Sequence, residues 1–289
     1  MHSTLFATLA LASFASFPLH AQVAGSTTTP TKATSTTTDE ADARVDATLE
    51  AAKKRVLAGD KDRAAATDFA TAVKAAYGGL TSWTPSADTI RTRLINEIND
   101  IYARAAKAEI KAEEFDILRI DAIDARLENA ISMAASDPTI DNLTRITNRL
   151  TKLAEAAKAM VPETVEFQAR AQAIVDALIK KARYTVRDLE PLKIEVSASR
   201  AERSDSILEK RAIAKTVVDH DFQRSKYHIS DHMALLAKTD PTVEELKVKL
   251  LAILDSLAAR AAGAGLTRAD FNDLKAQFIA RARLAAAPK

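Results

Sequence analysis

The residues of this chain best suited to chemistry are histidines and aspartates gathered in one segment. Of the five histidines, His220, His228 and His232 lie close together, with Asp231 beside the last of them. On a helix, His228 and His232 stand one turn apart on the same face. Imidazole and carboxylate groups are ligands that Zn²⁺ and Cu²⁺ accept. The sequence therefore predicts a candidate Zn or Cu site at His220, His228, Asp231 and His232, with solvated surface residues as the alternative.

The segment His228-Ile-Ser-Asp231-His232 is similar to the His-x-x-Glu-His signature of inverted zinc peptidases. It differs at the general base, where aspartate is one methylene shorter than the glutamate that must reach a zinc-bound water. The sequence also lacks a glycine-rich phosphate loop, a nucleophile elbow and any cysteine. We therefore expect a non-enzymatic protein with no resident cofactor.

Acidic pairs such as Asp121/Asp124 and Glu113/Glu114 are the remaining candidates for acid–base chemistry. They stand within charged helical patterns, where carboxylates are ordinarily solvated. We expect these pairs to face water.

Composition favours a large helical core. The chain has 289 residues, of which 47% are hydrophobic and 28% charged, and it contains only 6 glycines and 8 prolines. These two residues punctuate β-rich chains far more often. The formal net charge is +2 and aromatic residues make up 5%, so neither a basic field nor stacking platforms indicate nucleic-acid binding.

The amino terminus has the pattern of an export signal. An apolar run from Leu5 to Leu19 is too short to span a bilayer, and Leu19-His20-Ala21 suits a cleavage site. We predict a signal peptide over residues 1–21 and a Thr/Ser-rich disordered linker over 22–38. The protein is then exported, to a periplasmic or extracellular location.

Residues 39–289 are expected to form one all-α domain of roughly eight to ten helices, built as consecutive antiparallel hairpins in a bundle or short α-solenoid. Apolar residues recur at three- and four-residue spacing, and helix-start signals separate the stretches. Asp-Pro-Thr precedes a helix at 137–139 and at 240–242, and Thr267 with Asp270 forms a capping box.

An internal repeat runs through these helices. The stretch from Arg104 to Leu118 aligns without gaps on the stretch from Arg260 to Leu274, and the residues after Tyr184 form a weaker copy. Chance similarity of alanine-rich helices is the alternative. The alignment predicts duplicated hairpin units at 87–134, 139–194 and 240–287.

The insertion at 195–239 differs from these units. Its first part is highly charged with a thin apolar stripe, which predicts a long, partly solvated helix or arm that finds a partner elsewhere, as in a coiled coil.

The functional expectation is an exported scaffold or chaperone-like interaction protein of the cell envelope, with a protein partner or self-association at this arm or at a hairpin groove. Metal binding by the histidine cluster is a second hypothesis. Association with a membrane surface is a third, disfavoured because the polar faces mix both charges instead of being basic.

Overall fold

The computed structural model describes residues 31–77 and 87–282. The predicted signal peptide, 1–21, and the first part of the predicted linker lie outside the described residues. Helical backbone begins at Thr31, inside the segment predicted as linker.

The described chain consists of ten α-helices and two short 3₁₀ turns, with no strand among these residues. The helices are α1 (Thr31–Leu57), α2 (Ala64–Tyr77), α3 (Ala87–Ala105), α4 (Ala112–Ser136), α5 (Ile140–Ala157), α6 (Thr164–Lys181), α7 (Glu190–Ile213), α8 (Asp219–Leu236), α9 (Val243–Gly263) and α10 (Asn272–Ala282). The turns are η1 (Val186–Leu189) and η2 (Arg268–Phe271). The predicted all-α fold is confirmed.

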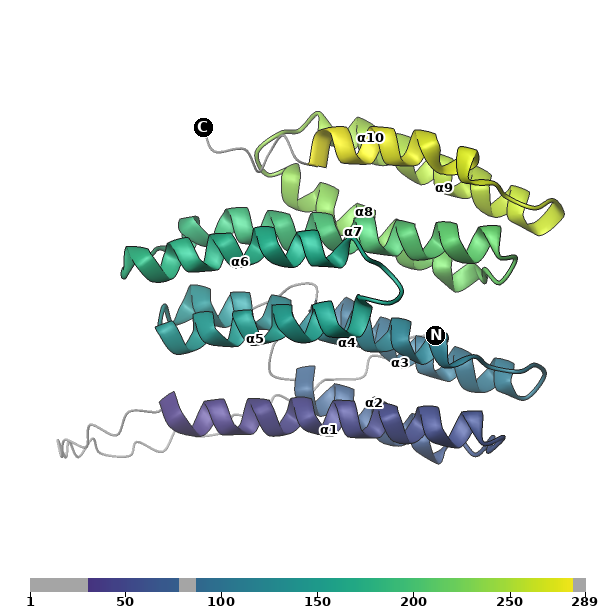
Figure 1. Cartoon of the computed structure of the whole chain (residues 1–289), viewed down its shortest axis with the longest axis horizontal. Coiled ribbons are helices and arrows are strands. Elements are labelled where there is room, and N and C mark those ends of the chain that lie inside the picture. Colours follow the sequence, from purple (N-terminus) through teal and green to yellow (C-terminus); the bar gives the residue numbers. More distant parts are fainter. Residues whose placement is uncertain (1–30, 78–86, 283–289) are drawn as a thin grey trace, which may run out of the picture.

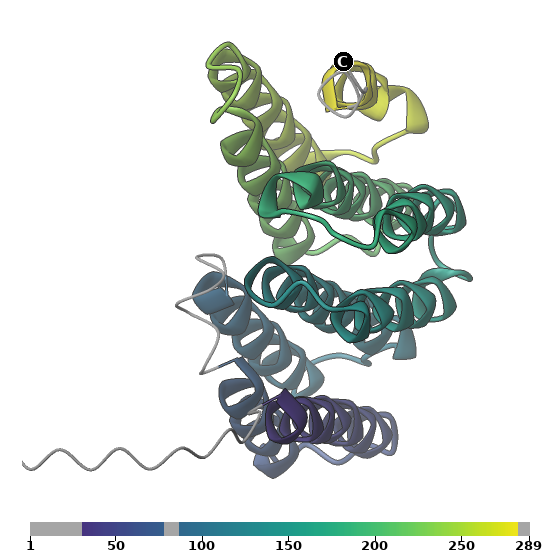
Figure 2. The same ribbon diagram turned by 90° about the vertical axis from the view of Figure 1, so that its left-hand side faces the viewer.

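Each helix packs on its neighbour along the chain, so the hairpins form a stack (Figure 1). Seen from the side, the layers follow chain order from α1–α2 at one end to α9–α10 at the other (Figure 2). Contacts between non-consecutive helices, for example between α1 and α4 and between α4 and α7, tie the layers together. This arrangement is the short α-solenoid expected from the repeated hairpin pattern.

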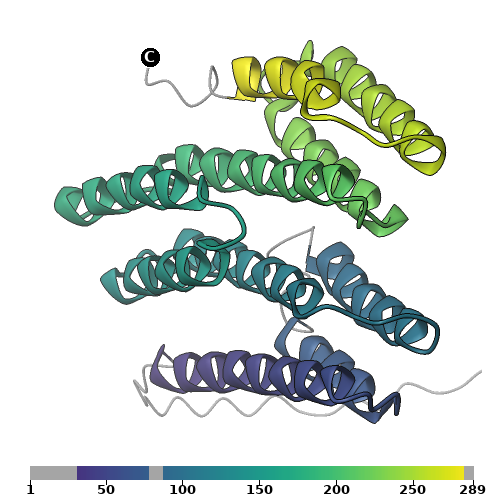
Figure 3. The ribbon, with the colours of Figure 1, turned by 45° about the vertical axis from the view of Figure 1, so that its right-hand side comes forward.

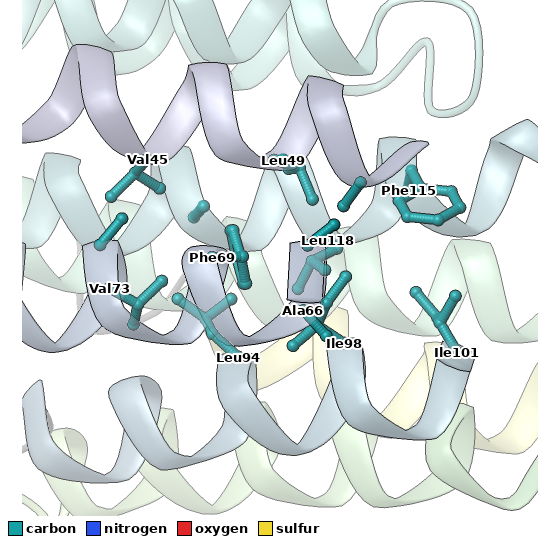
Figure 4. Packing of buried hydrophobic residues seen from close by; sticks show 14 of the residues in the cluster. Val45, Leu49, Ala66, Phe69, Val73, Leu94, Ile98, Ile101, Phe115 and Leu118 are labelled. Carbon is teal, nitrogen blue, oxygen red and sulfur yellow. The ribbon is translucent and has the colours of Figure 1, made fainter. Parts of the chain in front are cut away.

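The apolar faces of the helices are buried against one another in successive clusters along the stack. Figure 4 shows the first cluster, in which Phe69 of α2 lies among Leu49 of α1, Leu94 of α3 and Leu118 of α4. Further clusters join α4 to α7 and α7 to α10. A helix with apolar side chains on two faces, such as α4, can contribute to two successive clusters.

The helix starts follow the local chemistry predicted for them. The Thr139 hydroxyl accepts the Asn142 N–H at the start of α5, and Asp270 accepts the Thr267 N–H before α10. Pro191 lies in the first turn of α7, where its missing N–H leaves no helical bond unmade.

The aligned repeats also share a side-chain contact in the structure, a pair between an arginine and an acid. Arg104 pairs with Glu114 and Arg260 pairs with Asp270, each across a separation of ten residues. A third pair of the same separation joins Arg211 to Asp221, which the sequence analysis missed. In all three turns the residue after the acid is a buried phenylalanine: Phe115, Phe222 and Phe271.

The long charged helix expected near 195–239 is present, but the prediction that it is partly solvated is wrong. Residues 190–236 form α7 and α8, which lie inside the stack between the α4–α5 and α9–α10 helices (Figure 3). Arg200, Arg203 and Arg211 are buried, with 1–5% of their surface exposed. Acidic groups from α4 and α8 pair with these guanidinium groups, which the local charge pattern of α7 cannot reveal.

The three Arg–acid turns differ in burial and should therefore differ in their contribution to stability. The side chains of Arg211 and Asp221 are 6% and 4% exposed, whereas Arg260 is 52% exposed. Arg211→Ala leaves a buried carboxylate short of a partner, so we expect a loss of about 3 kcal/mol. Arg260→Ala should cost less than about 1 kcal/mol.

Urea unfolding of both variants measures these losses. Equal losses in the two variants would contradict the difference expected from burial.

Candidate functional site

The most unusual feature of the described residues is a set of charged and titratable side chains, most of them buried, between α3–α4 and α7–α8. We call it the ion-pair layer. Removing a charge from water costs several kcal/mol unless partners compensate. The members of the layer are Arg93 and Glu97 of α3, Asp121, Asp124 and Glu128 of α4, Arg200, Arg203 and Arg211 of α7, and Asp221, Arg224, His228 and Asp231 of α8.

Arg224 is the centre of one half of the layer. Its Nε donates to Asp121 at 2.8 Å, its Nη2 to Glu97 at 2.9 Å and its Nη1 to Asp221 at 3.1 Å. Burial alone would lower the pKa of Arg224, but its carboxylate partners outweigh that effect and raise the pKa above its ordinary value. One guanidinium thus joins α3, α4 and α8.

The other half of the layer is arranged around two arginines of α7. Arg203 Nη2 lies 2.5 and 2.6 Å from the two Asp124 oxygens. Arg200 pairs with both Glu128 and Asp231. Burial raises the pKa of Glu128 to about 7, and the nearby Arg200 opposes that rise. These contacts hold α4 against α7 and α8.

The expectation that Asp121 and Asp124 face water is wrong. Asp121 is 4% exposed and Asp124 is 1% exposed. Their helix, α4, carries apolar residues on nearly every side, for instance Ile120 and Ile123. That all-round apolar pattern is the signal in the sequence that could have marked these acids as buried.

The structure encloses His228 completely. Its Nε2 lies 3.0 Å from Arg93 Nη1 and 3.8 Å from an Asp121 oxygen. Because a guanidinium only donates, Nε2 must accept, so the imidazole is neutral with its proton on Nδ1. Burial, followed by repulsion from Arg93, lowers the pKa of His228 well below its ordinary value.

The other predicted ligands make separate contacts. His232 Nδ1 lies 2.7 Å from the Ser197 hydroxyl, and its ring packs edge-on against Phe278 of α10. His220 Nε2 lies 2.7 Å from Glu97, while Asp231 pairs with Arg200. Each candidate therefore has its own partner, which lies on α3 for His220 and His228 and on α7 for Asp231 and His232.

Metal binding finds little geometric support. Within residues 31–77 and 87–282, no three His, Asp or Glu side chains are grouped so that they could hold a metal ion. The Arg93 cation beside His228 Nε2 would also repel a divalent ion. The Zn or Cu hypothesis remains a prediction to be tested.

An open cleft of about 640 Å³ lies beside the ion-pair layer, between α3 and α8. One wall is formed by Asp88, Thr89, Arg91, Thr92, Arg93 and Asn96, and the other by His220, Gln223, Arg224 and Tyr227. A second, water-sized cavity of about 20 Å³ touches Glu97, Arg211 and Asp221. Arg93 and Arg224 of the ion-pair layer thus line an open cleft. The sequence analysis did not predict the cleft because its walls are far apart in the chain.

Scans against protein-family models, curated proteins and solved structures found no match to this chain.

The buried histidines predict a loss of stability in acid. Burial lowers the pKa of His232 to about 4, so below pH 6.5 the unfolded chain binds a proton that the native state does not. The neutral His232 contributes fully to the stability of the native state above pH 6.5, and this contribution is lost as the pH falls towards 4. The loss amounts to about 2 kcal/mol at pH 5.

His232→Gln should remove this share of the pH dependence in urea unfolding at pH 7.5 and pH 5. Glu128 titrates with the opposite sign, but it is common to both proteins, so the difference between them isolates His232. An unchanged slope in the variant would contradict the assignment.

Asp205 gives the opposite prediction. Burial raises the pKa of its carboxyl to about 8, so the native state at pH 7 holds a proton that the unfolded chain releases. The stability contributed is complete below pH 3.8 and is lost as the pH rises towards 8. The Asp205→Asn side chain is neutral at every pH, so this variant should be more stable than the natural protein by roughly 4 kcal/mol at pH 7.

Asp221→Asn is the matched control, since Asp221 is equally buried but pairs with Arg211 and Arg224. It should lose at least about 3 kcal/mol. If both Asn variants were destabilised alike, the assignment of a neutral Asp205 would be wrong.

The metal hypothesis is tested by thermal melting of residues 31–289 with EDTA, Zn²⁺ or Cu²⁺. A ligand that binds only the native state must raise the melting temperature with concentration. The contacts made by His228 and His232 predict coincident curves. A saturable rise that is abolished by His228→Ala/His232→Ala would establish a metal site instead.

Proposed function

We propose that this chain is an exported, non-enzymatic interaction protein of the cell envelope, acting as a scaffold or chaperone-like binder. Its contact surface is the cleft between α3 and α8. The observation that supports this proposal is the form of the cleft: an open groove of about 640 Å³ whose walls come from two layers of a helical stack. Stacked hairpins of this kind provide extended binding surfaces in other solenoid proteins.

The position of the charged residues favours binding over catalysis. Asp121, Asp124 and His228 are at most 4% exposed and are engaged with arginines. Such groups hold helices together and do not reach a substrate in the cleft. Several side chains exposed on the cleft walls, among them Thr92, Asn96 and Gln223, are uncharged hydrogen-bonding groups suited to recognition.

Export rests on the apolar run from Leu5 to Leu19 and the small residue at Ala21. Among the described residues, no helix combines the length and the apolar character needed to cross a bilayer.

Cross-linking in intact source cells tests location and contact surface together. The chain contains no cysteine, so Thr92→Cys on the cleft wall provides a single attachment point. We expect a membrane-impermeant, thiol-reactive photo-cross-linker to join this variant to one discrete partner or to a second copy.

Thr151→Cys is the matched control, since Thr151 is an exposed threonine of α5. The proposal fails if both variants give the same adducts, or if the reagent reaches neither of them until the cells are lysed.

A further inference from the structure

We propose that the α3–α8 cleft binds an acidic segment of a partner protein, with a glutamate or aspartate carboxylate of that segment seated against Arg93. This inference rests on the proposed function and names the chemistry of the partner. It is carried by the arrangement of charge in the cleft, by two buried donors without partners, and by the length of the groove.

The charges beside the cleft are arranged in order of depth. Arg93 and Arg224 line the cleft, whereas Glu97, Asp121 and Asp221, which neutralise them, do not. The one acid on the cleft wall, Asp88, is 2.5 Å from Arg91. The guanidinium groups of Arg93 and Arg224 thus lie nearer the cleft than the carboxylates that neutralise them, with His220 beside them.

Contacts with neighbouring residues fix the orientation of the Arg93 side chain. Its side chain is 10% exposed, and Nη1 contacts Asp121 at 2.9 Å and His228 at 3.0 Å. The guanidinium lies over the Tyr227 ring, 5.2 Å from its centroid. These contacts fix its orientation before any ligand arrives, which reduces the entropy lost on binding.

Two donors at this place have no partner within the described chain. They are Arg93 Nε and the Tyr227 hydroxyl, both shielded from water. A buried donor without an acceptor is costly. A carboxylate oxygen is an acceptor for either donor once it displaces the side chains that shield them, and a guanidinium edge that includes Nε matches the two oxygens of a carboxylate.

The shape of the cleft favours a peptide segment over a compact small molecule. On α3 the walls run through Thr89, Thr92 and Asn96, and on α8 through His220, Gln223 and Tyr227. Each set spans two helical turns, or about 10 Å. An extended chain covers that length with about three residues, and the amides of Asn96 and Gln223 can bond to its backbone.

The test uses a synthetic peptide, acetyl-Gly-Glu-Gly-Glu-Gly-amide, titrated into the ¹⁵N-labelled protein. We expect saturable shifts of backbone amides in residues 87–96 and 220–227. The matched peptide with Gln in place of Glu should bind about tenfold more weakly, because hydrogen bonds to charged groups are the stronger class.

Two tyrosine variants separate a binding role from a structural one. Tyr227→Phe keeps the ring under Arg93 but removes the unpartnered hydroxyl. It should weaken the Glu peptide roughly fivefold without lowering the melting temperature of the free protein. Tyr102→Phe removes an equally unpartnered buried hydroxyl outside the cleft and should leave peptide binding unchanged.

Equal binding of the Glu and Gln peptides, or no shift at millimolar peptide, overturns the inference. So does free glutarate binding as tightly as the Glu peptide, which would make the cleft a site for small carboxylates. Discrete adducts at Thr92→Cys without peptide binding would leave the proposed function standing and remove only this inference.

Discussion

The stability of the stack depends on the pairing of the charged groups that are buried between its α3–α4 and α7–α8 layers. Arginines and carboxylates removed from water there destabilise the native state unless each finds its partner. Arg224, which bonds to Glu97, Asp121 and Asp221 at once, can do so only when α3, α4 and α8 are all in place. Apolar contacts between consecutive helices tolerate small shifts, whereas this set of bonds requires one relative position of the layers. The ion-pair layer therefore specifies how the first half of the solenoid sits on the second.

Local features of the fold could be predicted from the sequence because local residues determine them. The stripe through Leu143, Ile146 and Leu150 and the caps at Thr139 and Thr267 depend on neighbours within one or two turns. The burial of Asp124 and Arg203 could not be predicted in the same way. Each residue alone looks like part of a solvated face, and only the pairing across α4 and α7 shows the opposite.

The histidine cluster illustrates the same limit. The spacing of His228 and His232 correctly placed both on one helix, but it could not show that Arg93 would approach one and Ser197 the other. The Arg211–Asp221 turn has the same arginine, acid and phenylalanine spacing as the aligned stretches that begin at Arg104 and Arg260. The thin apolar stripe of α7 made this third copy hard to recognise in the sequence. The buried phenylalanine after the acid, Phe222 in this copy, was the available signal.

Arg93 takes part both in the packing of the layers and in the proposed recognition of a ligand. The same guanidinium that contacts Asp121 inside the layer lines the cleft, so a ligand there would also act on the joint between the two halves. Native-state hydrogen exchange tests the central claim, that the ion-pair layer makes the middle of the stack one cooperative unit. We predict that amides of α4, α7 and α8 exchange most slowly and share one opening free energy, while α1 and α10 open first. Separate opening of α4 and α7, with slower exchange in α1–α2 than in α7–α8, would contradict it.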